Sequence, residues 1–87
     1  VYKSIAFRNM GFIYNHLAQY DSALWFYQQS LDIGQTLKDP EQLSLTLLYR
    51  GHTWFLLGDF KKALSDYTTA AEYMRNNTYL RYYALLL

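Results

Sequence analysis

The chain repeats one pattern at a distance of forty residues. Residues 9–14 (NMGFIY) return as residues 49–54 (YRGHTW), and each copy places a glycine inside an apolar helical pattern with an aromatic residue three positions later. A glycine in a helix interior costs roughly 1 kcal/mol relative to alanine, so such a glycine usually marks a close approach of another helix. Gly11 and Gly51 therefore predict two helix crossings.

The repeat extends well beyond the two glycines. Six further pairs match at the same offset: Leu17 with Leu57, Tyr20 with Phe60, Ala23 with Ala63, Leu24 with Leu64, Tyr27 with Tyr67, and Asp32 with Glu72. One structural unit is thus written twice. The small Ala23 and Ala63 are expected to pack against the glycine of the partner helix in each unit.

Apolar spacing of three and four residues predicts four helices and the start of a fifth. The expected spans are about 2–17, from about 20 past Gly34 to about 38, 40–57, 60–74 and 78–87. The residues expected in the core are Ala6, Met10, Ile13 and Leu17; Ala23, Leu24, Tyr27, Leu31 and Ile33; Leu43, Leu47, Gly51, Trp54 and Leu57; and Ala63, Leu64, Tyr67, Ala70, Ala71 and Met74.

Short connections join these helices, which predicts antiparallel hairpins over residues 2–38 and 39–76. At the boundary between them, Asp39 can cap the next helix, Pro40 suits a first helical position, and Gln42 stands where a capping box closes. Gly58 is expected to take a left-handed conformation, and Asp59 to cap the helix that follows. The fold class predicted is all-α.

In this register the chain resembles the tetratricopeptide repeats. The first copy matches the family pattern at Phe7, Met10, Gly11, Tyr14, Ala23 and Tyr27, with Ser30 in place of the last alanine. The second copy matches at Leu47, Gly51, Trp54, residues 57–60 (LGDF), Ala63, Tyr67 and Ala70. The resemblance implies a superhelical solenoid of stacked helix hairpins.

Three departures from the family pattern stand out. The period is forty, where thirty-four is usual, as in the longer repeats of bacterial regulatory proteins and kinesin light chains. Arg50 replaces the usual leucine before glycine, so the second hairpin must hold a guanidinium near its core or let it extend outward. Ala18 replaces a turn glycine, which costs of the order of 1 kcal/mol if the left-handed geometry is kept.

The resemblance also implies a concave groove lined by the first helix of each hairpin, which holds an extended or helical peptide. Arg8 is expected to pair with a carboxylate, and Asn9 or Asn15 to bond a peptide backbone. The alternative is that this face packs on a neighbouring repeat or faces water. The predicted contact residues are Ile5, Arg8, Asn9, Phe12, Asn15 and His16, with Leu45, Leu48, Tyr49, His52, Phe55 and Leu56.

The family's carboxylate clamp for chaperone tails is a poor match. It would require a basic residue at position 8 and asparagine at both 12 and 49, and only Arg8 agrees with that pattern. The groove is therefore expected to bind in another manner.

The sequence lacks the residues that other functional classes require. The formal charge is +1, cysteine is absent and no polybasic face exists, so direct nucleic-acid or membrane binding is not predicted. His16 and His52 have no carboxylate one helical turn away, which argues against a metal site. No nucleophile elbow, phosphate loop or His-Glu-x-x-His motif occurs, so neither catalysis nor a cofactor is predicted.

The sequence thus predicts a non-enzymatic protein-interaction module that binds a protein or peptide, as part of a longer regulatory or signalling protein. The alternative is a structural or oligomerisation segment without a ligand of its own. No signal peptide or membrane span is recognisable, so the compartment is cytoplasmic by default and otherwise unknown. Self-association is expected through the apolar residues Tyr82, Tyr83, Leu85, Leu86 and Leu87.

Overall fold

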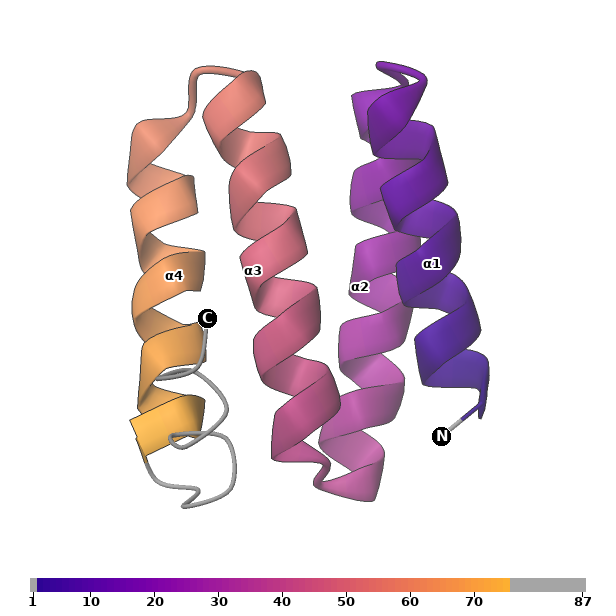
Figure 1. The fold of residues 1–87 in the computed structure, drawn as a ribbon, viewed down its shortest axis with the longest axis vertical. Helices are drawn as coiled ribbons and strands as arrows, with labels where there is room; N and C mark the ends of the chain where they lie inside the picture. The colour runs from indigo at the N-terminus through magenta and orange to yellow at the C-terminus, as the bar shows by residue number, and fades with distance from the viewer. Residues whose placement is uncertain (1, 76–87) are drawn as a thin grey trace.

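The computed structural model describes residues 2–75, which form four α-helices and, within that range, no strand. They are α1 (Tyr2–His16), α2 (Tyr20–Leu37), α3 (Pro40–Leu56) and α4 (Phe60–Arg75) (Figure 1). The predicted all-α class is confirmed, and α2 continues past Gly34 as expected. The predicted helix over 78–87, and the apolar residues proposed there for self-association, lie outside the described residues.

The helices run alternately up and down and pair as two hairpins (Figure 1). The turns that join α1 to α2 and α3 to α4 lie at one end of the molecule, and the turn from α2 to α3 lies at the other. Helix α2 packs against both α1 and α3, and α1 also touches α3. The second hairpin therefore stacks on the first through α3.

Both hairpin turns have the same backbone. Ala18 takes φ 58° and Gly58 takes φ 84°, so the left-handed geometry is kept although alanine stands at the first turn. In each turn two amides donate back to the preceding helix. Ala18 N donates to Asn15 O at 3.1 Å and Gln19 N to Tyr14 O at 2.9 Å. Their equivalents are Gly58 N to Phe55 O at 3.0 Å and Asp59 N to Trp54 O at 2.9 Å. Such bonds satisfy carbonyls that the helix end leaves free.

Two aspartates start helices as predicted. Asp39 Oδ1 accepts from Gln42 N at 3.3 Å, and Asp59 Oδ1 accepts from Lys62 N at 3.1 Å. Pro40 is the first residue of α3. The expected capping box is not closed, however, because the Gln42 side chain accepts a hydrogen bond from Arg8 instead.

The apolar core lies where α2, α3 and α4 meet. Its buried members are Leu31, Leu43, Leu47 and Ala70, and Leu48 and Tyr73 pack against them. Gly34 permits this contact, because a Cβ added there would lie 3.0 Å from Leu43 Cδ2. This glycine in α2 thus brings the first hairpin close to the second.

The glycines at the two helix crossings face tyrosine rings and not the expected alanines. A Cβ on Gly11 would lie 2.5 Å from Tyr27 Cε1, and one on Gly51 would lie 2.7 Å from Tyr67 Cε1. The crossing prediction is confirmed, but the partner was wrong, because the ring four residues beyond each alanine reaches across to the glycine. Ala23 and Ala63 are themselves buried.

The predicted core of the first helix is wrong. Met10, Ile13 and Leu17 are 39%, 53% and 59% exposed, and Ala6 is exposed as well. Helix α1 instead buries a face that contains Ser4, Gly11 and Asn15. The apolar stripe has helical period but lies on another side of the helix. Of the other expected core residues, Leu57, Leu64 and Ala71 are also exposed.

Polar groups fill the interior between the hairpins. Ser30 Oγ lies 3.0 Å from Thr46 Oγ1 and donates to Ser4 O at 2.8 Å, which joins α1, α2 and α3. All three residues are at most 1% exposed. Burial also raises the pKa of Tyr27 in α2 to about 12. Because buried polar groups must be paired, this network fixes one stacking arrangement of the hairpins.

The predicted guanidinium near the second hairpin's core is present and paired. Arg50 Nε and Nη2 donate to Asp66 Oδ2 and Oδ1 at 2.7 and 2.8 Å, which is a bidentate ion pair between α3 and α4. Arg50 Nη1 also donates to Gln28 in α2 at 3.0 Å. The Arg50 and Asp66 side chains are 21% and 8% exposed, so the pair lies at the edge of the core.

Candidate functional site

The face predicted to bind a partner is formed by α1 and α3, and we call it the α1–α3 surface. Most of its predicted members are at least partly accessible: Asn9, Phe12, His16, His52, Phe55 and Leu56 are exposed, and Ile5, Arg8, Leu45, Leu48 and Tyr49 are half-buried. The two helices touch each other directly. The surface is therefore continuous between the two hairpins.

Arg8 joins α1 to α3. Its Nη1 donates to Gln42 Oε1, and its guanidinium carbon lies 5.9 Å from the centre of the Tyr49 ring. Its Nε is buried and has no hydrogen-bond partner within residues 2–75. Arg8 also makes no ion pair in that part of the chain. An ordered cation is thus held without a counter-charge among the described residues.

Aromatic rings continue the surface from Arg8. The Phe12 and Tyr49 ring centroids lie 5.6 Å apart, and those of Phe12 and His16 lie 4.4 Å apart. His16 Nδ1 lies 3.2 Å from Phe12 O, which ties this ring to its own helix. Phe12 is 43% exposed, so an aromatic ring next to Tyr49 and Arg8 is accessible to solvent.

The remaining predicted residues fall into different surroundings. His52 is exposed on α3, and Phe55 lies 5.3 Å from the Phe60 ring near the second turn. Leu48 packs against the apolar core. For Ile5, Asn9, Leu45 and Leu56, the structure shows accessibility and no specific partner contact. Their role in binding stays a prediction.

The expected accessibility of Asn15 is wrong. Its side chain is 8% exposed, and its Oδ1 accepts a hydrogen bond from Thr53 Oγ1 at 2.8 Å. Helical arithmetic on one helix could not reveal this, because the residue is covered by α3 from the other hairpin. Gln42 was missed for a related reason, since its position in a cap pattern hid its contact with Arg8.

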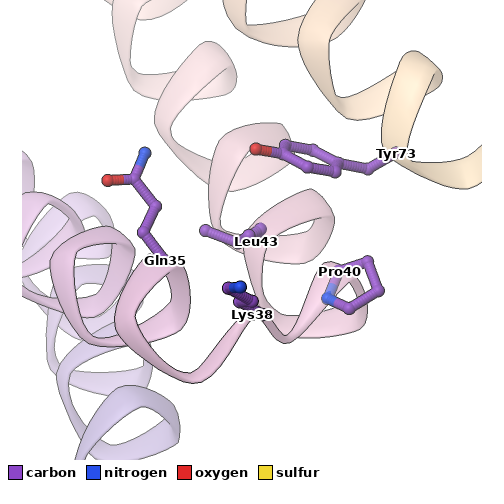
Figure 2. Close-up of a pocket in the computed structure, with 5 residues that line it drawn as sticks. All are labelled: Gln35, Lys38, Pro40, Leu43 and Tyr73. Carbon is purple, nitrogen blue, oxygen red and sulfur yellow. The ribbon is translucent and has the colours of Figure 1, made fainter.

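A separate pocket of about 340 Å³ lies where α2 ends, α3 begins and α4 ends (Figure 2). Its lining residues are Gln35, Lys38, Pro40, Leu43 and Tyr73. Figure 2 shows the Tyr73 hydroxyl directed across Leu43 toward α2. Sequence reasoning gave no sign of this pocket, because its walls come from three helices.

The part of the chain that the structure describes holds neither a metal-binding cluster nor a membrane-spanning helix. Within residues 2–75, no three histidine or acidic side chains are grouped so that they could hold a metal ion. No helix in the same range is long and apolar enough to cross a membrane. The ionisable groups that do come together, Arg50 with Asp66 and Lys62 with Asp59, form structural ion pairs.

Comparison with known proteins identifies the repeat. A family model described as "Tetratricopeptide repeat" matches residues 2–76, which is most of the chain. No curated protein and no solved structure matches the sequence. Repeats of this family are in general non-catalytic modules that bind proteins or peptides, and the four antiparallel helices with two glycine crossings agree with that assignment. The chain belongs to the tetratricopeptide repeat family.

Proposed function

We propose that the chain binds a segment of a partner protein on the α1–α3 surface, and that this segment presents a carboxylate to Arg8 and an apolar side chain to Phe12. The observation that carries the proposal is the state of Arg8. Its guanidinium is positioned by Gln42 and Tyr49, yet it lacks an acidic partner within residues 2–75.

Charge chemistry favours an acidic ligand at this point. Buried polar donors are normally paired, and Arg8 Nε is an exception among the described residues. A hydrogen bond between guanidinium and carboxylate is among the stronger ones in proteins, and the half-buried setting reduces screening by water. Because Arg8 is already held in place, little side-chain freedom is lost on binding.

The rings next to Arg8 supply the apolar part of the site. Phe12 is in contact with both Tyr49 and His16, so its ring is supported on two sides while its face remains accessible. Aromatic residues with firm support often dominate binding energy at protein interfaces. His52 and Phe55 extend the same face along α3 for the rest of the partner segment.

A displayed library of random peptides, selected on the full chain, tests the proposal. We expect enrichment of peptides with an acidic residue close to a large apolar residue. Arg8→Gln is expected to weaken an enriched peptide about 10- to 100-fold, the effect of losing a hydrogen bond to a charged group. Phe12→Ala is expected to weaken it as well, while the circular dichroism spectrum stays unchanged.

Lys61→Gln is the matched control, because it removes one exposed positive charge from α4, away from the α1–α3 surface. It should bind the enriched peptides as the parent chain does. Equal losses in Arg8→Gln and Lys61→Gln would indicate a general charge effect and contradict the proposed site. Enriched peptides that bind Arg8→Gln and Phe12→Ala normally would contradict it too.

A further inference from the structure

Arg8 carries a positive charge that no acidic side chain of this sequence neutralises. The sequence holds seven acidic side chains, and all of them lie within residues 2–75. The ion pairs in that range are made by Arg50 and Lys62, and Arg8 takes part in neither. A counter-charge for Arg8 must therefore come from another molecule or from solvent ions.

The side chain that holds Arg8 in place is the neutral Gln42. It lies in the first turn of α3, is 8% exposed, and accepts a hydrogen bond from Arg8 Nη1 through Oε1. A guanidinium can only donate hydrogen bonds, so the oxygen of the amide must face Arg8. This bond joins the two hairpins and positions the cation without placing a negative charge beside it.

The start of α3 does not account for the orientation of Gln42. In a capping box, the side chain at the third helical position accepts from the backbone amide of the N-cap residue, which is Asp39 here. The Asp39 amide already donates to Gly34 O at 3.0 Å, and the Gln42 amide is capped by Asp39 Oδ1. The cap thus leaves the Gln42 side chain free to contact Arg8.

A glutamate at position 42 would suit the local structure in two ways. An acid in the first turn of a helix is stabilised by the positive end of the helix dipole. A carboxylate would also form an ion pair with Arg8, where the amide now accepts one hydrogen bond. That ion pair would neutralise the cation inside the chain. Glutamine has nearly the same shape and leaves the charge available to a ligand.

The forty-residue repeat does not require the contact between Arg8 and Gln42. The equivalent of Arg8 is Leu48, which packs against the apolar core, and the equivalent of Gln42 is Tyr2, which is 90% exposed. Neither Arg8 nor Gln42 therefore belongs to the pattern that builds the hairpins. The pair is specific to the contact between α1 and α3.

We propose that Gln42 determines the preference of the α1–α3 surface for an acidic ligand, because it positions Arg8 with a neutral acceptor and so leaves the charge for the carboxylate of the partner segment. The role of Gln42 rests on the proposed function, since it concerns the same site. Gln42 is a positioning residue, which acts on the ligand through Arg8. Tyr49 also contacts the cation from α3 and carries no charge.

Two peptides that differ in one side chain test the proposal. One is an acidic peptide enriched on the full chain, and in the other the acidic residue is replaced by the matching amide. The parent chain should prefer the acidic peptide about 10- to 100-fold. Gln42→Glu should bind the acidic peptide at least about tenfold more weakly than the parent does and the amide peptide about equally well, so the preference disappears. A purely structural role would weaken both peptides alike.

Two further variants separate the charge at position 42 from the shape of the side chain. Gln42→Met keeps the length and leaves Arg8 charged but less ordered, so binding should weaken about 2- to 10-fold while the acidic peptide is still preferred. Gln35→Glu adds the same charge on α2, in the pocket of Figure 2, and should bind both peptides as the parent does. Circular dichroism checks that each variant has the helicity of the parent.

The same measurements distinguish failure of the proposal from failure of the proposed function. If the parent and Arg8→Gln show the same ratio of affinities for the two peptides, Arg8 does not recognise the acid and the proposed function fails. If Arg8→Gln loses the preference and Gln42→Glu retains it, the proposed function stands and the role of Gln42 is overturned. Unchanged affinity in Gln42→Met would overturn that role too, whether or not Gln42→Glu folds, because Arg8 would then not need the amide.

Discussion

The first and second hairpins are built on the same contact between a glycine and a tyrosine ring, yet they differ at the turn and at one pair of equivalent positions. In the second hairpin, Arg50 and Asp66 form a bidentate ion pair, whereas Met10 and Phe26 occupy the equivalent positions in the first. Where two copies of one unit keep a feature, the backbone requires it. Where the two copies differ, equivalent positions hold side chains of different chemistry.

The turns show a second difference of this kind. Gly58 and Asp59 give the second turn a residue suited to the left-handed conformation and a side chain that caps α4. Ala18 and Gln19 stand in the first turn, where φ is 58° and no side chain caps α2. The backbone is the same in both, so the first turn keeps its shape at a local energetic disadvantage.

Removing the acid of the ion pair should have the largest effect. Asp66→Ala leaves Arg50 beside the core without its carboxylate, and breaking a buried pair in this way costs about 3–5 kcal/mol. Arg50 is 21% exposed and can recover some hydration, so we expect about 3 kcal/mol. Urea unfolding followed by circular dichroism measures the loss.

The first hairpin supplies the control for this variant. Arg50→Met with Asp66→Phe copies the pair at positions 10 and 26, and apolar replacement of a buried ion pair is often nearly neutral. We expect the double variant to recover most of the stability. If it unfolds as easily as Asp66→Ala, the two residue pairs are not interchangeable and the comparison of the hairpins fails at this point.

An added methyl group at the helix crossings should have the next largest effect, and the two hairpins should respond unequally. Gly11→Ala forces a Cβ toward Tyr27, which is 1% exposed and has no room to move, whereas Gly51→Ala meets the half-buried Tyr67. Overpacking costs about 1–3 kcal/mol and alanine returns about 1 kcal/mol in helix propensity. We expect a net loss of about 2 kcal/mol at Gly11 and about 1 kcal/mol at Gly51.

Thermal unfolding of the two variants measures the difference. Tyr27→Leu removes the ring that the added methyl group meets. It should therefore cost less stability in the Gly11→Ala variant than in the parent chain. Equal losses with and without the methyl group would contradict a direct contact between the glycine and the ring.

The sequence predicted the elements better than the faces. Gly58, Asp39 and Asp59 meet local requirements of a turn and of two helix starts, and the boundaries of the helices followed from such signals. The buried face of α1 was predicted wrongly, because periodicity shows that an apolar stripe exists and cannot show which neighbour covers it. In this chain the stripe faces outward.

Within the candidate site, the contacts across helices were the part that could not be predicted. Asn15 bonds Thr53 and Arg8 bonds Gln42, and both partners lie more than thirty positions away on another helix. The pair of Arg50 and Asp66 could be predicted from the sequence, since both are charged where the other copy has the apolar Met10 and Phe26. A matched pair of departures between two copies indicates a contact.

A glycine at the first turn should stabilise the protein modestly. Ala18→Gly removes the steric penalty of a Cβ at φ 58°, which is about 1 kcal/mol after allowing for the greater freedom of glycine in the unfolded chain. The reverse change, Gly58→Ala, should destabilise by a similar amount, because φ is 84° at this position. No neighbouring atom lies within 4 Å of the added Cβ, so no clash adds to that cost. Urea unfolding of both variants checks whether their effects are opposite in sign.

The smallest effect should come from the missing cap of α2. Gln19→Asp places at the first turn the residue that caps α4, and its carboxylate is expected to accept from the amide of Ser22, as Asp59 accepts from that of Lys62. An N-cap of this kind is worth about 0.5–1 kcal/mol, and it is needed at a helix end whose amides lack a side-chain partner.

Asp59→Gln makes the opposite change in the second turn and should lose about the same free energy. Amide hydrogen exchange distinguishes the cap from a general charge effect, since only the amide of Ser22 and its neighbours should slow in Gln19→Asp. Slowing spread evenly over α2 would mean that the new charge acts through the helix dipole. In that case the first turn does not have the geometry that lets Asp59 act as a cap, and the two turns are alike in backbone shape alone.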